Sequence, residues 1–449
     1  MNLDVKTRLQ ELLGEARRYL SISRGKVVYR DRRGFEVVES IKDLMVEYYI
    51  GSPTLMEVSS WITAFNKLLE DTVKVLGGRG WSFPREFKSF TLDPRAHLKK
   101  KLFNYTFDLL RGRIAVEEYM SKSRQALASS LRSNVRSLYQ FWVFLGIIRE
   151  LGSLGARIVY PEYGFIVLDR SGRQKTGSIP PNLVLNIEGR GELSFFIEAP
   201  RPLGWEDTRD LSMVWRLYVS LRPDILVYSG RVMDIVDLTG DIPIRRPNVI
   251  IECKEMPDWY KRSRILKGSI AKPLTAEEWM SRWIRGLWEG LGEALGVSRE
   301  QLGELIEKSR GGIRVSEVEL ILLYKETYKP DAFILVSQPK LDRPIKLDLE
   351  TRGVIVVDGV GIGERGRVRE LSEILLEYAK PEEWDPVDTV KHIVSSRLGR
   401  DVERRLVEEA LLELALTRID EVIELVNKLS VRGEQQAEIR AQDSLGSSA

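Results

Sequence analysis

Three residues at the ends of two predicted strands have side chains that could act together in catalysis. The β-branched run Val249–Ile251 predicts a buried strand, and it leads directly into Glu252, Cys253 and Lys254. Successive side chains of a strand point to opposite faces, so we expect Glu252 and Lys254 to share a face while Cys253 points into the core. Asp224 stands at the head of another apolar run, and pairing of the two strands would bring it beside Glu252.

Two neighbouring carboxylates and an ammonium suit metal-assisted hydrolysis of a phosphodiester. Carboxylates that lie side by side repel each other unless a cation neutralises them. Their hard oxygen atoms favour Mg²⁺ or Mn²⁺, whose remaining waters can be replaced by phosphate oxygens. Such an ion activates a bound water, and Lys254 would stabilise the transition state electrostatically. We therefore expect the metal ligands to be Asp224, Glu252 and the backbone carbonyl of Cys253.

The order of these residues resembles a known nuclease pattern. Pro223-Asp224 followed by Glu252-Cys253-Lys254, each on a predicted strand, resembles the PD-(D/E)xK nuclease superfamily, whose fold is restriction-endonuclease-like. The resemblance covers roughly residues 131–380, and in detail the chain is most similar to the branch that includes the nuclease subunits of modification-dependent restriction systems. It implies an α/β fold with a mixed sheet flanked by helices. It also implies a metal-dependent endonuclease that hydrolyses DNA, in defence against foreign DNA or in repair.

The resemblance extends to a helix, where the chain departs from the family. The segment Ser137–Phe144 resembles the first core helix, in which many members carry a glutamate; this chain has Gln140 there. An amide oxygen can accept a hydrogen bond or bind a metal, but it adds no negative charge. We expect Gln140 to belong to the catalytic site with a weakened hold on the metal. Glu150 and Glu198 are possible substitutes for the missing carboxylate.

Basic residues near the two strands are candidates for contact with the phosphate backbone. Cationic side chains bind phosphates, and the rings of Trp259 and Tyr260 would be available for stacking. An exposed basic loop with one buried tryptophan is an equally good interpretation. Arg245 also belongs to this basic neighbourhood. The candidate nucleic-acid-binding residues are Arg222, Arg246, Lys261, Arg262, Arg264 and Lys267.

The pattern along the chain divides it into four parts. Residues 1–130 predict a mainly helical domain with a small hairpin, for recognition or partner docking. Residues 131–380 predict the nuclease-like domain. Residues 381–430 predict a helical extension, and residues 431–449 predict a disordered tail because they are polar and poor in apolar residues.

Several elements within these parts are predicted with definite bounds. The small hairpin is expected from residues 26–29 and 34–38. A helix is expected to begin at Ser133, as its N-cap, and to stop at Gly152. The strands of the nuclease-like domain are expected at 156–160, 164–168, 182–187, 193–197, 224–228, 248–252, 332–336 and 353–357, the last two resembling the closing half of the family fold.

Three other interpretations remain open at this stage. Gly361–Gly366 is a literal G-x-G-x-x-G between a strand and a helix, so the chain could be a nucleotide-binding enzyme, although no second parallel strand follows. The chain could also be an inactive nuclease-like scaffold or nucleic-acid-binding subunit of a larger complex, which Gln140 favours and Lys254 opposes. Finally, Lys254 and Glu255 could merely solvate the end of a strand while Asp224 caps a turn.

Composition sets outer limits on the function. The 449 residues include two histidines and one cysteine, which leaves little room for a zinc site, a catalytic triad or an internal disulfide. The longest apolar run is too short to cross a membrane, and a single cysteine suits the cytoplasm. The net charge of +3 does not by itself indicate nucleic-acid binding. A double-strand cut needs two active sites, so a homodimer or a complex with a motor or sensor subunit is plausible.

Overall fold

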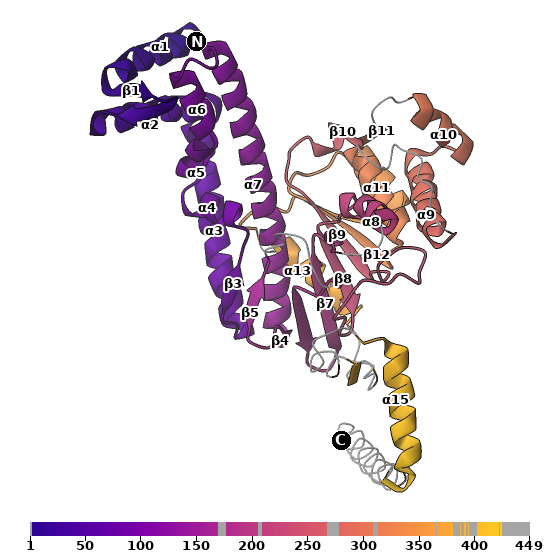
Figure 1. The fold of residues 1–449 in the computed structure, drawn as a ribbon. Coiled ribbons are helices and arrows are strands. Elements are labelled where there is room, and N and C mark those ends of the chain that lie inside the picture. The colour runs from indigo at the N-terminus through magenta and orange to yellow at the C-terminus, as the bar shows by residue number, and fades with distance from the viewer. Residues whose placement is uncertain are drawn as a thin grey trace. The chain divides into compact units, whose positions relative to one another are not determined.

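The chain forms two compact units, Met1–Glu382 and Glu383–Ala449. The computed structural model (Figure 1) describes residues 2–168, 177–204, 209–266, 278–308, 313–364, 366–379, 387, 390–391, 394, 402–421 and 423. In the second unit, α15 (Arg404–Thr417) agrees with the predicted helical extension. The predicted disordered tail, 431–449, lies outside the described residues. No helix in the described parts of the chain is long and apolar enough to span a membrane.

The N-terminal part of the first unit is mainly helical, as predicted. Its apolar residues, among them Leu9, Ile41 and Tyr119, form a hydrophobic core of their own. This core is separate from the two cores on the faces of the sheet. The elements of this part are α1 (Asn2–Tyr19), β1 (Leu20–Ser23), β2 (Lys26–Tyr29), α2 (Arg32–Tyr49), α3 (Ser52–Leu76), β3 (Gly80–Ser82), α4 (Arg85–Leu92), α5 (Pro94–Lys101) and α6 (Phe103–Leu110).

The predicted hairpin of this part is wrong in one strand. Residues 26–29 form β2, but its antiparallel partner is β1. Residues 34–38 lie in α2, because Asp31 caps that helix by accepting the backbone N–H of Gly34 at 3.2 Å. Val37, Val38 and Ile41 are buried on one side of α2, so their spacing was helical rather than alternating.

One long helix, α7 (Val116–Ser153), joins the helical part to the sheet. Ser133 lies in its interior and caps nothing, so the predicted helix start is wrong, whereas the end near Gly152 is right. The boundary predicted at residue 130 also falls inside this helix, and both predicted domains belong to one compact unit. Tyr119 and Leu127 pack in the N-terminal core, while later residues of α7 pack against the sheet.

A seven-stranded mixed sheet forms the centre of the predicted nuclease-like region. Its order is β13-β12-β9-β8-β7-β6-β4. Strands β9, β12 and β13 are parallel to one another, and the remaining neighbours are antiparallel. Its strands are β4 (Ala156–Tyr160), β6 (Leu183–Ile187), β7 (Gly191–Ile197), β8 (Ile225–Ser229), β9 (Val249–Lys254), β12 (Ala332–Ser337) and β13 (Val354–Asp358).

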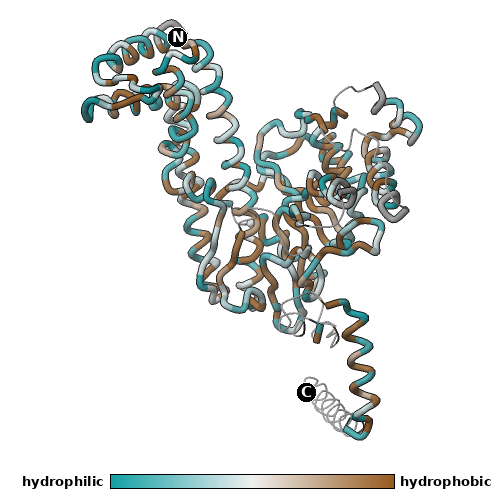
Figure 2. Tube along the Cα trace, in the orientation of Figure 1, coloured by the Kyte–Doolittle hydropathy of each residue, from teal (hydrophilic) through white to brown (hydrophobic). Residues whose placement is uncertain are grey.

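Helices cover both faces of this sheet, as the apolar strand sequences predict. On one face, α7, α3 and α13 (Gly366–Leu376) pack against residues such as Val227 and Ile251. On the other face, α8 (Arg209–Ser220), α9 (Glu278–Leu295) and α11 (Glu317–Tyr328) pack against Leu226 and Ile250. Hydrophobic residues run along the central strands in Figure 2. A Cβ at Gly146 of α7 would lie 2.7 Å from a methyl carbon of Val368, so glycine permits the close approach of α13.

The remaining elements were only partly predicted. The strand expected at 164–168 is β5 (Phe165–Val167), and it pairs with β3 instead of joining the main sheet. The basic segment after Lys254 forms the 3₁₀ turn Trp259–Lys261 and then β10 (Ser263–Leu266), which pairs with β11 (Ile313–Ser316). Helices that the sequence reading missed are α8, α10 (Arg299–Lys308), α11 and α12 (Arg343–Thr351).

Candidate active site

The register of β8 and β9 brings the two candidate carboxylates together. These strands are antiparallel, with Ile225 opposite Ile251, so Asp224 lies opposite Glu252 one residue further on. The backbone nitrogen of Asp224 donates a hydrogen bond to Oε2 of Glu252 at 3.2 Å. Asp224 is completely buried and Glu252 is 1% exposed. The proximity predicted from two segments distant in sequence is therefore present.

Each carboxylate oxygen of Asp224 has a defined partner. Oδ2 accepts the backbone N–H of Cys253 at 2.8 Å, and Oδ1 accepts from the guanidinium of Arg136 at 3.0 Å. The backbone carbonyl of Asp224 accepts from Nε2 of Gln140 at 3.1 Å and from the backbone nitrogen of Glu198 at 2.8 Å. Asp224 is thus fixed from three sides.

Lys254 lies between two carboxylates. Its ammonium donates to Oε1 of Glu252 and to Oε2 of Glu317, both at 2.9 Å. Glu317 also accepts two hydrogen bonds from the guanidinium of Arg264 at 2.7 Å. Cys253 packs in the core on the opposite face of the sheet, as strand alternation predicts. We call Arg136, Asp224, Glu252, Lys254 and Glu317 the charge cluster.

Burial and charge set the protonation of the cluster. Burial raises the pKa of Glu252, as does the neighbouring Asp224, and the cations Lys254 and Arg136 offset this only in part. Burial would lower the pKa of Lys254, but the carboxylates of Glu252 and Glu317 raise it above its usual value. Burial would raise the pKa of Glu317, yet Lys254 and Arg264 hold that pKa below its usual value. Lys254 therefore stays an ammonium at neutral pH.

Two members of the cluster were missed by the sequence reading, although each had a signal. Glu317 begins α11, whose start is marked by a capping box in which the side chains of Ser316 and Glu319 bond each other's backbone nitrogens. Arg136 lies four residues before Gln140, so the two share a face of α7. The side chains of Arg136 and Gln140 both reach Asp224.

The substitutes considered for the missing helix glutamate have different positions. Gln140 is buried, and its amide nitrogen donates to the backbone carbonyl of Asp224. This contact holds the main chain of Asp224 in place. Glu150 lies further along α7 and pairs with Arg149, which places it away from the cluster. Glu198 follows β7, and its register places it next to Asp224 on the side away from Glu252.

The predicted basic residues do not form one group. Arg222 precedes Asp224 closely in the chain, and burial lowers its pKa. Arg246 pairs with Asp331 at 3.3 Å before the start of β9, about 20 Å of extended chain from Glu252. Arg245 lies beside it, so the expectation that these two arginines flank the site is wrong.

The basic segment after the strand contributes one contact to the cluster. Arg264 bonds Glu317, whereas Arg262 pairs with Asp258 at 2.8 Å. Lys261 is exposed and lies 5.5 Å from the ring of Tyr260. Lys267 lies outside the described residues.

Trp259 is a core residue. It is 2% exposed, and its indole nitrogen donates to Oγ of Ser337 at 3.1 Å. The ring is therefore not available to stack on a base, and the expected stacking role of Trp259 is wrong.

In the described part of the chain, the glycine-rich loop is not followed by the second strand that a dinucleotide fold needs. It follows β13, which is an edge strand of the sheet, and precedes α13. No further strand follows α13 in the described part of the chain. Asp358, at the end of β13, accepts the backbone N–H of Leu341 at 2.8 Å and pairs with Lys346 at 2.9 Å. The acid at this loop therefore has structural partners.

The oxygen donors of the cluster suit a hard divalent cation. Asp224 and Glu252 supply two adjacent carboxylates, and each carboxylate oxygen retains a lone pair beyond the hydrogen bond it accepts. Among the described residues, no group of three or more His, Cys, Asp or Glu side chains could hold a metal ion. Asp224 and Glu252 alone could hold only an ion that keeps several waters, as Mg²⁺ does.

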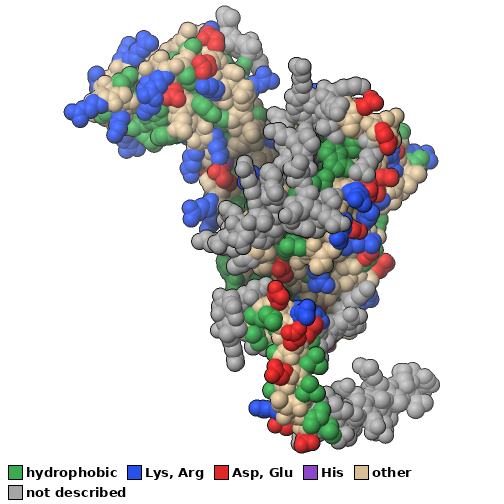
Figure 3. Space-filling view, turned by 45° about the vertical axis from the view of Figure 1, so that its right-hand side comes forward, with side chains coloured by type: hydrophobic (Ala, Val, Ile, Leu, Met, Phe, Trp, Pro, Cys, Tyr) green, Lys and Arg blue, Asp and Glu red, His purple; other side chains and the backbone are tan. Residues whose placement is uncertain are grey.

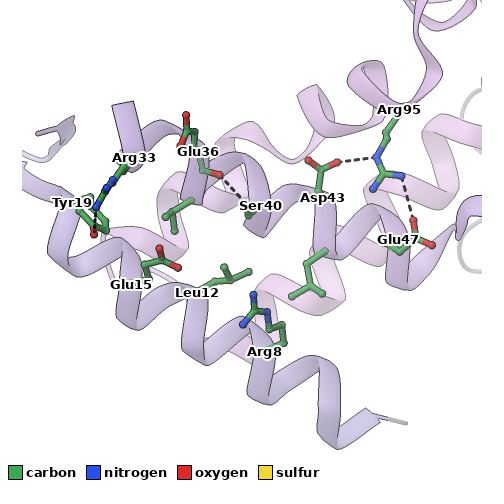
Figure 4. Close-up of a pocket in the computed structure, with 12 residues that line it drawn as sticks. Arg8, Leu12, Glu15, Tyr19, Arg33, Glu36, Ser40, Asp43, Glu47 and Arg95 are labelled. Atoms are coloured by element: carbon green, nitrogen blue, oxygen red, sulfur yellow. Dashed lines mark hydrogen bonds and ion pairs between the residues drawn. The ribbon is translucent and has the colours of Figure 1, made fainter. Parts of the chain in front are cut away.

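A surface hollow of about 630 Å³ lies elsewhere, between α1, α2 and Arg95 of α5 (Figure 4). Three of its charged residues pair with one another: Arg95 contacts Asp43 at 2.9 Å and Glu47 at 3.2 Å. Arg33 donates to the hydroxyl of Tyr19 at 3.4 Å. None of the predicted site residues lines this hollow. Its side chains do not converge on one ligand group, so it offers less chemistry than the charge cluster.

Comparisons with models of known protein families, with curated proteins and with solved structures found no match to this chain.

Proposed function

We propose that this protein is a metal-dependent endonuclease that hydrolyses phosphodiester bonds of DNA. The observation that carries the proposal is the arrangement of Asp224 opposite Glu252 across two strands, with the Lys254 ammonium bonded to Glu252. The PD-(D/E)xK resemblance supports the same reaction, because its motif residues are the ones that lie together. A mixed sheet with helices on both faces is compatible with that superfamily.

In this proposal the residues of the cluster have separate tasks. Asp224, Glu252 and the carbonyl of Cys253 would hold Mg²⁺ or Mn²⁺, which supplies an activated water and neutralises charge on the scissile phosphate. Lys254, held as an ammonium between Glu252 and Glu317, stabilises the extra negative charge of the transition state. Gln140 fixes the backbone of Asp224 so that its carboxylate keeps one direction.

The cations of the cluster connect it to the surface. The side chains of Arg136 and Arg264 are each 39% exposed, whereas the carboxylates that they contact are buried or nearly buried. Arg136 neutralises Asp224 in the described arrangement, so a divalent ion and Arg136 would share or exchange that carboxylate. The exposed part of Arg136 could then meet an incoming phosphate.

A second candidate function is an inactive nuclease-like subunit of a larger complex. The observation that favours it is the completeness of the pairing: Asp224 and Glu252 both already contact a cation, and neither carboxylate is exposed. Such a network can hold a fold together without catalysis. A homodimer, or an assembly with a motor or sensor subunit, is compatible with either function.

The deciding experiment combines cleavage with metal binding. Purified protein is incubated with supercoiled and single-stranded DNA in Mg²⁺, Mn²⁺ or chelator, alongside Lys254→Met. We expect cleavage only with the metal, and a fall of about two to three orders of magnitude in the variant, the usual cost of losing one transition-state donor. Lys88→Met, an exposed residue of α4, is the control for a lost lysine.

Two results would count against the nuclease. Equal cleavage by Lys254→Met and its parent would show that the activity comes from elsewhere. Mn²⁺ binding without cleavage of any of these substrates would favour the inactive subunit. Thermal unfolding of each variant checks that a loss of activity is not a loss of fold.

A further inference from the structure

The hairpin of the N-terminal part and the helix ends that flank it carry an excess of positive charge. Residues 17–33 contain seven basic residues and one acidic residue, although the whole chain has a net charge of only +3. The acidic residue, Asp31, is the N-cap of α2 and accepts the backbone N–H of Gly34. We call these seven basic residues the basic hairpin surface: Arg17, Arg18, Arg24, Lys26, Arg30, Arg32 and Arg33.

The hairpin geometry turns two of these basic residues, Arg24 and Lys26, toward solvent. β1 and β2 are joined by Arg24 and Gly25, whose φ angles of 51° and 73° form a tight two-residue turn with Arg24 at its tip. Leu20 packs in the N-terminal core. Strand alternation places Ser21, Ser23 and Lys26 on the opposite face.

Most of the charge on this surface is not neutralised by carboxylates. Among the described residues, Arg17, Arg18, Arg24 and Lys26 make no ion pair, and Arg30 donates to the backbone carbonyl of Arg18 at 3.3 Å. Arg33 donates to the Tyr19 hydroxyl, and only Arg32 pairs with a carboxylate, that of Glu36. Lys and Arg side chains predominate at this end of the N-terminal part in Figure 3. Unpaired charges of one sign create a field that attracts a polyanion.

We propose that the basic hairpin surface binds duplex DNA through the phosphate backbone. Arginine, lysine and serine side chains are the common donors to DNA phosphates, and all three types lie on the exposed hairpin. A two-stranded ribbon is also narrow enough to enter the major groove. The proposal rests on the proposed function only for the choice of DNA among polyanions.

A membrane surface fits the hairpin less well. Insertion at a bilayer surface requires a continuous apolar face. The face opposite Leu20 carries two serines and a lysine beside one apolar residue, Val28. The rings nearby pack on each other: Tyr29 lies edge-on to Phe35 at 6.2 Å and to Phe107 at 6.5 Å. The exposed side chains of Ile22 and Val28 are separate from one another, on opposite faces of the hairpin.

The test measures binding without cleavage. Fluorescence anisotropy follows the full-length protein on a duplex of about 20 base pairs in chelator, long enough to span a typical contact site. The double variant Arg24→Glu, Lys26→Glu is compared with Lys67→Glu, Lys88→Glu, which changes the charge equally at exposed residues of α3 and α4. Arg17→Gln with Arg18→Gln tests the same surface without charge reversal.

We expect the hairpin variants to weaken binding about tenfold or more at low salt, while the control variant stays near the parent. The slope of log K against log salt should fall by about 0.9 for each phosphate that the variant no longer neutralises. Circular dichroism checks that each variant is folded.

Four outcomes would overturn the inference. Three come from the anisotropy assay: the parent does not bind the duplex, the hairpin variants bind it as tightly as the parent, or the control variant loses as much affinity as they do. The fourth comes from a parallel assay with phosphatidylserine vesicles, if the hairpin variants lose vesicle binding while their DNA binding is unchanged. Whether the protein is a nuclease is decided separately, by the cleavage assay. Binding is measured in chelator, where no cleavage occurs, so Lys254→Met should bind the duplex like the parent. Hairpin-dependent binding by a protein that never cleaves would therefore keep this inference and reject the proposed function.

Discussion

Asp224 and Glu252 face each other across the antiparallel strands β8 and β9, and the backbone nitrogen of Asp224 donates to Oε2 of Glu252. Their two carboxylates are nevertheless tolerated in a buried position because Arg136 contacts one and Lys254 contacts the other. Two adjacent carboxylates therefore lie between two cations at the meeting point of β8 and β9. Single substitutions can separate the contribution of each charge.

Asp224→Asn should abolish metal binding while keeping the fold. The amide oxygen can still accept the backbone N–H of Cys253, but the negative charge that holds a divalent ion is gone. Mn²⁺ affinity, followed by calorimetry, should fall by more than the 10- to 100-fold typical of removing a residue that only supports a metal ligand. Asp331→Asn, near the other end of β9, is the matched control. Unchanged Mn²⁺ affinity in Asp224→Asn would remove this carboxylate from the proposed site.

Arg136→Gln should make stability depend on a divalent ion. Without the guanidinium, the buried Asp224 carboxylate loses a charge-assisted hydrogen bond, and we expect a loss of about 1–2 kcal/mol in chelator because Arg136 is partly exposed. Mn²⁺ would replace the missing charge, so it should raise the Tm of the variant more than that of the parent. Equal shifts in both proteins would mean that Arg136 and the ion do not compete for Asp224.

Glu317→Gln should slow cleavage without weakening DNA binding. Glu317 touches Lys254 and Arg264 but none of the proposed metal ligands, so its role would be to position the Lys254 ammonium. We expect kcat to fall by about 10- to 100-fold, as for other residues that support a site from outside, with little change in KM. Glu326→Gln, on the same helix, changes the same charge away from the cluster. A rise in KM with normal kcat would instead assign Glu317 to substrate binding.

Asp43→Asn should reveal a pH-dependent part of the stability of the N-terminal helices. Partial burial would raise the pKa of Asp43, but hydrogen bonds from Arg95 and Lys99 outweigh it and hold the pKa below its usual value. A lowered carboxyl pKa stabilises the folded state above the unfolded pKa, and this contribution disappears as pH falls through the folded pKa.

The difference in unfolding free energy between parent and Asp43→Asn should therefore be about 1 kcal/mol near pH 7, since the pairs are partly exposed. It should shrink below about pH 4, the ordinary range of an aspartate. Denaturant titrations at several pH values measure it. A difference that persists at low pH would show that the carboxylate charge is not the cause.

The sequence predicted the strands of the site better than the helices around it. Apolar runs with a charged residue at one end marked β8 and β9, and alternation alone placed Lys254 with Glu252 and away from Cys253. The expected position of Arg245 and Arg246 is wrong because residues near a site in sequence need not be near it in space: an extended strand carries the chain quickly away. Trp259 shows the same limit: only the packed structure tells a buried ring from an exposed one.

The helix errors have a different origin. Ser133 looks like a cap because serine often precedes a helix, but nothing local to it reports that the helix already began at Val116. Glu317 was missed because its partner Lys254 is distant in sequence and meets it only after β9 and α11 are packed. The capping box at Ser316 marks where the helix starts, without saying what its first turn will contact.

The uninterrupted course of α7 fixes an angular phase between two layers. Tyr119 and Leu127 belong to the N-terminal core, while Arg136 and Gln140 reach Asp224 from the same helix. One residue inserted between Leu127 and Arg136 would rotate one end against the other by about 100° and advance it by about 1.5 Å. Seven inserted residues would bring the phase back to within about 20°. Insertions into this segment should therefore be tolerated only when they add close to a whole number of helical turns, even though many of its side chains face water.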